Sequence, residues 1–227
     1  MNQLFFKSSL VKKYVVALTG VALYGFLLIH TLGNLQIFLG SAAINAYASL
    51  LKASPEILWG FRAGLLVMVL AHGLCAALLA IENRRARPAA YERIPKFGST
   101  VASRTMLGTG SVILIFVAYH IFHFTVRATH PDISFFHDSH GRHDVYSMVV
   151  LSFKQPALSL FYIVGVACVC FHLSHGVSSA FYSLGMVFAG YERLISRFAL
   201  AVSVFIFCGM SSVPIAVMFG ILKLVPS

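Results

Sequence analysis

The sequence predicts an all-α integral membrane protein, folded as a single domain around a bundle of five transmembrane helices. Of the 227 residues, 59% are hydrophobic and only 11% are charged. A soluble domain of this composition would expose large apolar patches, which soluble monomers rarely do. Runs of roughly 20 apolar residues are instead typical of membrane-spanning helices. Four of these runs also carry a histidine well inside them, at His30, His72, His120 and His172.

Polar or charged segments separate the five spans. We expect the spans at about 14–37, 59–82, 104–128, 155–186 and 197–223. The first run follows three lysines, as in a signal peptide, but it is too long for a signal h-region and is expected to stay in the protein. Pro88 and Pro95 interrupt any helix after the second span. Pro214 lies inside the fifth span, where Ser211 and Ser212 can satisfy the backbone groups that a proline frees.

Basic residues set the predicted orientation. Most of the 17 Lys and Arg residues lie in the N-terminal segment, in residues 83–104 and in residues 190–197. Cytoplasmic loops carry such an excess, so these segments and the N-terminus are expected to face the cytoplasm of a bacterial-type inner (plasma) membrane. Residues 38–58, residues 129–154 and the C-terminus then lie on the outer side. The formal net charge of +10 is explained in this way, and no nucleic-acid partner is expected.

The four histidines fall at two depths. With a rise of about 1.5 Å per residue and a membrane core of roughly 30 Å, His30 and His120 lie towards the outer side, and His72 and His172 lie nearer the inside. We name these the outer pair and the inner pair, and their levels are separated by on the order of 10–15 Å. The order along the chain is therefore outer, inner, outer, inner. We find no matching sequence identity between the two helix pairs, so this repeat is expected to be architectural only.

The membrane histidines need partners inside the bundle, because an ionisable side chain in hydrocarbon is costly. Two neutral imidazoles from different helices can hold the iron of one haem b, since helical bundles build cofactor sites from inward-facing side chains. Two levels of two histidines therefore predict two stacked b haems, enclosed by the five helices. The alternative is a hydrogen bond from each histidine to a neighbouring helix. The sequence has no Cys-x-x-Cys-His stretch, so the haems would not be attached covalently.

Five further residues are candidate cofactor contacts. His123 and His175 each follow a paired histidine by three residues and share roughly the same helix face. Either could be an iron ligand, a partner of a haem propionate or a quinone hydrogen-bond donor. Arg85 and Arg104 lie at the inner end and Arg127 at the outer end, where arginine can pair with the anionic propionates. The ordinary role of a side chain that reaches to the membrane edge explains each arginine equally well.

Histidines also gather in the outer segment, at His130, His137, His140 and His143. Their spacing could bind a metal ion, but an exposed polar loop near the membrane interface is the better explanation. The segment could also line the outer mouth of a quinone site. No carboxylate lies in the middle of a span. Proton pumps and cation-coupled transporters usually need buried acids, so transport is not the expected function.

Several short motifs resemble one known family. They are Gly25–His30, Ala71–Gly73, Ser103–Thr105 followed by Ala118–His120, Asp144–Val150 and Phe171–Gly176. Together with the chain length and the number of spans, they resemble the cytochrome b558 subunit of succinate dehydrogenase and fumarate reductase. The resemblance is to the five-helix type, in which a single membrane anchor holds two haems, and it covers nearly the whole chain.

The resemblance implies a function and a set of ligands. It implies that His72 and His172 hold the inner, proximal haem and that His30 and His120 hold the outer, distal haem. The preference for His120 and His172 over their neighbours three residues later rests mainly on this resemblance. It also implies a flavoprotein subunit and an iron–sulfur subunit on the cytoplasmic face, with dicarboxylate chemistry on these partner chains. The chain itself would carry electrons between the clusters and a quinone, usually menaquinone, in a complex that could form a higher oligomer.

Two other functions remain open at this stage. The chain could be the dihaem cytochrome b subunit of another membrane dehydrogenase or reductase, such as formate dehydrogenase or nitrate reductase. It could also be a transporter or structural membrane protein without haem.

Some members of the resembling family have a glutamate near the last haem ligand, whereas Cys168, Cys170 and Phe171 stand there in this chain. For the quinone, we expect an outer cavity near the outer haem.

Overall fold

The computed structural model describes residues 8–86, 101–186 and 190–224, with no description of the side chains of residues 101–104. The elements in chain order are α2 (Ser9–Leu35), η1 (Gln36–Leu39), α3 (Ser41–Lys52), α4 (Pro55–Arg85), α5 (Val101–His120), η2 (Ile121–Val126), η3 (Pro131–Ile133), α6 (Val145–Phe153), α7 (Pro156–Ser183) and α8 (Glu192–Met218). In the described parts of the chain, the only β pairing is an isolated bridge between His137 and His143. The predicted all-α class is therefore confirmed.

Within the described residues, five helices are long and apolar enough to cross a membrane, in agreement with the predicted multi-pass membrane protein. Their bounds are Ser9–Leu39, Pro55–Arg85, Thr105–Val126, Pro156–Ser183 and Glu192–Met218. The fourth and fifth helices end earlier than predicted. Gly185 and Gly220, both with φ of +70°, follow them, and glycine in this left-handed conformation ends a helix by bonding back to its last carbonyls.

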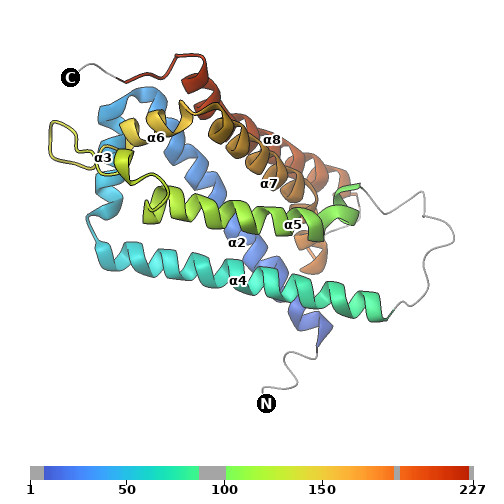
Figure 1. The fold of residues 1–227 in the computed structure, drawn as a ribbon. Helices are drawn as coiled ribbons and strands as arrows, with labels where there is room; N and C mark the ends of the chain where they lie inside the picture. The colour runs from blue at the N-terminus through green and yellow to red at the C-terminus, as the bar shows by residue number, and fades with distance from the viewer. Residues whose placement is uncertain (1–7, 87–100, 187–189, 225–227) are drawn as a thin grey trace.

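Helix α2 lies at the centre of the bundle. It packs against α4, α7 and α8, while α5 and α8 both pack against α7. Helices α2, α5 and α8 begin at the end of the bundle that carries the N-terminus, and α4 and α7 end there (Figure 1). We call this the N-terminal end and the opposite end the loop end. At the N-terminal end, the ammonium of Lys12 on α2 pairs with Glu82 on α4.

Short helices cover the loop end, where the sequence predicted loops. Helices α3 and α6 contact each other there, close to the chain's C-terminal segment (Figure 1). Asp144 begins α6 by accepting a hydrogen bond from the backbone N–H of Ser147 at 3.0 Å, as a carboxylate at an N-cap position does. The prediction that residues 38–58 and 129–154 are loops is therefore incomplete, because each segment contains a short helix that tertiary contacts stabilise.

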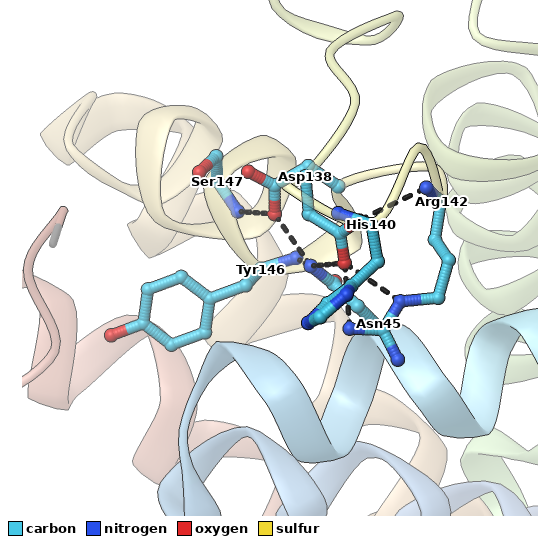
Figure 2. Close-up of polar contacts among 7 residues, drawn as sticks. Asn45, Asp138, His140, Arg142, Tyr146 and Ser147 are labelled. Carbon is cyan, nitrogen blue, oxygen red and sulfur yellow. Dashed lines mark hydrogen bonds and ion pairs between the residues drawn. The ribbon is translucent and has the colours of Figure 1, made fainter. Parts of the chain in front are cut away.

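Asn45 joins the two short helices. Its side chain is only 1% exposed, and its carbonyl oxygen accepts the backbone N–H of Tyr146 at 3.0 Å. Its amide group donates to Asp144 at 3.0 Å and to Asp138 at 3.4 Å (Figure 2). One buried amide thus connects α3, the outer segment and the start of α6.

Hydrogen bonds keep the Asp138 carboxylate charged. Desolvation acts to raise the pKa of Asp138, but the Arg142 side chain and the backbone N–H groups of Arg142 and His140 lower that pKa to about 2. The contribution of the charged carboxylate to stability is therefore complete above the ordinary pKa of 3.8 and is lost as pH falls from there towards about 2. The Asp138 carboxylate is therefore charged at neutral pH.

Replacing Asn45 by leucine is expected to destabilise the loop end. The change leaves the Tyr146 N–H unpaired and removes an amide donor from both carboxylates, and a buried polar group without a partner costs about 1–3 kcal/mol. Thermal unfolding in detergent should show this loss. Asn83→Leu, at an exposed position of α4, is the matched control and should change the free energy of unfolding by less than about 0.5 kcal/mol. Equal stability of the two variants would contradict the role given to Asn45.

Candidate functional site

The inner pair comes together between α4 and α7. The rings of His72 and His172 have their centres 6.4 Å apart, and their planes are inclined by 62°. Gly20 of α2 lies against the His72 ring, since a Cβ atom there would be 3.2 Å from Cε1 of that histidine. The inner pair therefore lies at the level of Gly20.

The outer pair comes together between α2 and α5. The ring centres of His30 and His120 are 5.9 Å apart, with an angle of 87° between the planes. Along α2, His30 follows Gly20 by ten residues, which corresponds to roughly 15 Å of helix axis. The structure thus forms the two pairs, at two levels, that the depth argument predicts.

The spacing within both pairs fits an iron atom between the rings. An imidazole nitrogen lies about 2 Å from the metal that it binds, so two opposed imidazole ligands put their ring centres roughly 6 Å apart. A porphyrin supplies four ligands of its own, so two histidines per level complete the coordination.

A threonine hydroxyl lies within hydrogen-bond distance of Nδ1 in each histidine of the inner pair. Nδ1 of His72 lies 3.1 Å from the Val16 carbonyl oxygen and 3.2 Å from Oγ1 of Thr19. Nδ1 of His172 lies 3.1 Å from Oγ1 of Thr109. Thr19 donates its own hydrogen to the Val15 carbonyl at 2.6 Å. The hydroxyl oxygen is then free to accept Nδ1–H, which leaves Nε2 without a proton and able to bind a metal.

The outer pair is held differently. Phe26 stacks on His30 with ring centres 5.3 Å apart, and Phe116 lies 6.2 Å from the ring centre of His120. The Asn34 amide bonds the His30 carbonyl at 2.8 Å and lies 3.4 Å from Nδ1 and 3.3 Å from Nε2, so it does not distinguish the two ring nitrogens. No described residue hydrogen-bonds to the His120 ring.

His123 points away from the outer pair. Its side chain is fully buried, with Nδ1 2.8 Å from the Tyr162 hydroxyl and Nε2 3.1 Å from Oγ of Ser152. The cause is local, because α5 changes into a π-helical turn at Ile121, whose wider winding breaks the three-residue register that the sequence argument assumed. Both ring nitrogens therefore lie within hydrogen-bond distance of hydroxyl groups on α6 and α7.

The remaining candidates lie at the edges of the bundle. His175 is half-buried on α7, and its ring bonds to no described residue. Arg85 is exposed at the end of α4, with no hydrogen bond or ion pair in the described chain. Arg127 lies over the Phe135 ring at 4.5 Å and donates to the Ser134 carbonyl at 3.5 Å. The side chain of Arg104 lies outside the described residues.

The histidines of the outer segment do not gather around a common point. The His143 ring lies 2.9 Å from the Ser134 carbonyl oxygen, and His130 packs against His123 with ring centres 5.2 Å apart. Among the described residues, no three His, Cys, Asp or Glu side chains come close enough to hold a metal ion.

An open apolar groove of about 430 Å³ lies along the loop half of α8. Phe38 of η1 and the α8 residues Cys208, Ser211 and Ser212 are among its lining residues. The helix face beside it packs on α2, because a Cβ atom at Gly209 would lie 2.9 Å from the side chain of Thr31. Because Thr31 directly follows His30 in the chain, the groove lies near the level of the outer pair.

The structure corrects the expectation that the two helix pairs share an arrangement but no matching residues. Six residues recur in the two helix pairs, and they make matching contacts in each. In chain order they are Thr19, Gly20, Phe26, His30, Phe61 and His72 in the first pair, and Thr109, Gly110, Phe116, His120, Phe161 and His172 in the second. The Phe–Phe contacts match as well, with ring centres 6.0 Å apart for the first pair and 5.8 Å for the second. The shared spacing from threonine to outer histidine was the signal in the sequence.

Comparison of the chain with known protein families, with curated proteins and with solved structures finds no match.

Proposed function

We propose that this chain is a dihaem cytochrome b that carries electrons through a membrane. One observation carries the proposal, namely that four helices present two pairs of histidines with ring centres 6.4 Å and 5.9 Å apart, at two levels of one bundle. Hydrogen bonds to neighbouring helices would not by themselves require the histidines to meet in pairs. The distances between the paired ring centres match the roughly 6 Å that two opposed imidazole ligands require.

Each histidine has a defined role in this proposal. His72 and His172 would hold the iron of the inner haem, and His30 and His120 that of the outer haem. Bound haem b supplies a one-electron iron couple at each level. The two levels are separated by roughly 15 Å along α2.

The resemblance of the motifs supports a more specific role. We propose the membrane anchor of a succinate:quinone or quinol:fumarate oxidoreductase in a bacterial-type inner membrane, with the N-terminus on the cytoplasmic side. A flavoprotein and an iron–sulfur subunit would dock on the basic N-terminal end, where the dicarboxylate reaction would take place. The groove along α8 is the candidate contact for the quinone, which we expect to be menaquinone.

A difference spectrum of the purified complex tests the proposal. Dithionite-reduced minus oxidised spectra, with haem counted as the pyridine haemochrome, should show two b haems per chain. A folded preparation that retains its native partners and contains no haem would overturn the proposal. Oxidation of the reduced haems by fumarate, or their reduction by succinate, would support the specific role, whereas a response to formate or nitrate would assign the chain to another complex.

A further inference from the structure

The inner pair has a feature that the outer pair lacks. Each inner histidine receives a threonine hydroxyl from a different helix, with Thr19 of α2 3.2 Å from Nδ1 of His72 and Thr109 of α5 3.1 Å from Nδ1 of His172. Thr109 shows the same back-bonding as Thr19, since its hydroxyl lies 3.1 Å from the Thr105 carbonyl. With its hydrogen directed to this carbonyl, the hydroxyl acts as an acceptor towards the ring.

The contact occurs twice with the same surroundings. A glycine follows each threonine and makes room for the ring, because a Cβ atom at Gly20 would lie 3.2 Å from Cε1 of His72 and one at Gly110 would lie 3.6 Å from Cε1 of His172. Thr19 precedes His30 by the same number of residues as Thr109 precedes His120. A chance hydrogen bond would not recur with its neighbouring glycine and its spacing in both halves.

We propose that Thr19 and Thr109 are positioning residues for the inner haem, an inference that rests on the proposed cytochrome function. By accepting Nδ1–H, each hydroxyl would fix the tautomer and the rotation of one inner imidazole and would leave its Nε2 available to bind the haem iron. A hydrogen bond to the far nitrogen also makes an imidazole a more basic ligand. The bundle is thus a repeated unit in which each half supplies one ligand to each level and one threonine to the inner level.

Thr109 is the more sensitive position. In the described chain, its hydroxyl is the only hydrogen-bond partner of the His172 ring, whereas His72 keeps the Val16 carbonyl at 3.1 Å when Thr19 is changed. Loss of such a contact typically weakens metal binding 10- to 100-fold. If the binding of His172 to the iron became tenfold weaker in the ferric state alone, the midpoint potential of the inner haem would rise by about 59 mV.

The test is a redox titration of the complex followed by optical and low-spin EPR spectra. Thr109→Val keeps the shape of the side chain and removes the hydroxyl, while Thr109→Ser restores a hydroxyl without the methyl group. Thr31→Val is the matched control, because the Thr31 hydroxyl also bonds back to a carbonyl, that of Leu27 at 2.8 Å, but contacts no histidine. His172→Ala identifies which signals belong to the inner haem.

We expect Thr109→Val to shift the potential and the EPR signal of the inner haem alone, or to lose that haem, with Thr109→Ser close to the original protein. Thr31→Val should leave both haems unchanged. Unchanged inner-haem signals in Thr109→Val, or a Thr109→Ser variant that behaves like Thr109→Val, would overturn the positioning role while leaving the cytochrome function intact. Absence of haem from the unmodified complex would instead overturn the function itself.

Discussion

Replacing His172 by alanine is expected to remove the proposed inner haem and to leave the proposed outer haem in place. The His172 ring faces His72 with 6.4 Å between ring centres, and a haem held by two opposed imidazoles is retained poorly by one. The outer pair lies roughly 15 Å away along the helix axis, beyond the reach of any repacking around a single alanine. The haem content should therefore fall from two per chain to about one.

His175→Ala is the matched control for this experiment. His175 lies on the same helix, three residues further on, and its half-buried ring bonds to no described residue. The pyridine haemochrome count of this variant should remain at two per chain. If His175→Ala loses a haem and His172→Ala retains both, then the two histidines have exchanged roles and the inner pair is wrongly assigned.

Replacing Gly165 by alanine is expected to disrupt the contact between α5 and α7. A Cβ atom at Gly165 would lie 2.3 Å from Cδ2 of Phe116, so the phenyl ring must leave its place. That ring lies 6.2 Å from His120 and 5.4 Å from Tyr162, measured between ring centres. Overpacking of this kind costs about 1–3 kcal/mol, and we expect the outer haem to be bound more weakly as well.

Two further variants separate this clash from a general effect of added methyl groups. Gly64 on α4 is exposed, and a Cβ atom there would meet nothing within 4 Å, so Gly64→Ala should unfold at the original temperature or slightly above it. Combining Gly165→Ala with Phe116→Leu should recover part of the lost stability. A Gly165→Ala protein that melts with the original midpoint, measured by circular dichroism in detergent, would refute the close approach of the two helices.

The spans and the histidine pairs could be predicted from the sequence because they depend on local properties. Apolar length identifies a membrane helix, and the constant rise per residue converts a position such as that of His30 or His72 into a depth. The short helices at the loop end could not be predicted in this way. Helix α6 is stabilised by its contacts with Asn45, which lies 101 residues before Tyr146 in the chain.

The direction of the His123 side chain and the histidine contacts of the two threonines could not be predicted from the sequence either. A π-helical turn changes the direction of His123 without a proline or glycine to signal it. Thr19 and Thr109 resemble ordinary polar residues that bond back to their own helix. Their second contact, with a histidine of another helix, is visible only once the helices are packed, and that contact in turn shows which positions of the two halves correspond.

The division of each histidine pair between the two halves of the chain has a consequence for biogenesis. Helices α2 and α4 together carry His30 and His72, one ligand for each level, and α5 and α7 carry the other two. A nascent chain that has inserted only its first hairpin can therefore retain neither of the proposed haems. Capture of the proposed outer haem must wait until α5 has entered the membrane, and capture of the proposed inner haem until α7 has entered. A chain loaded with both haems is therefore one in which both hairpins have been synthesised and have found each other.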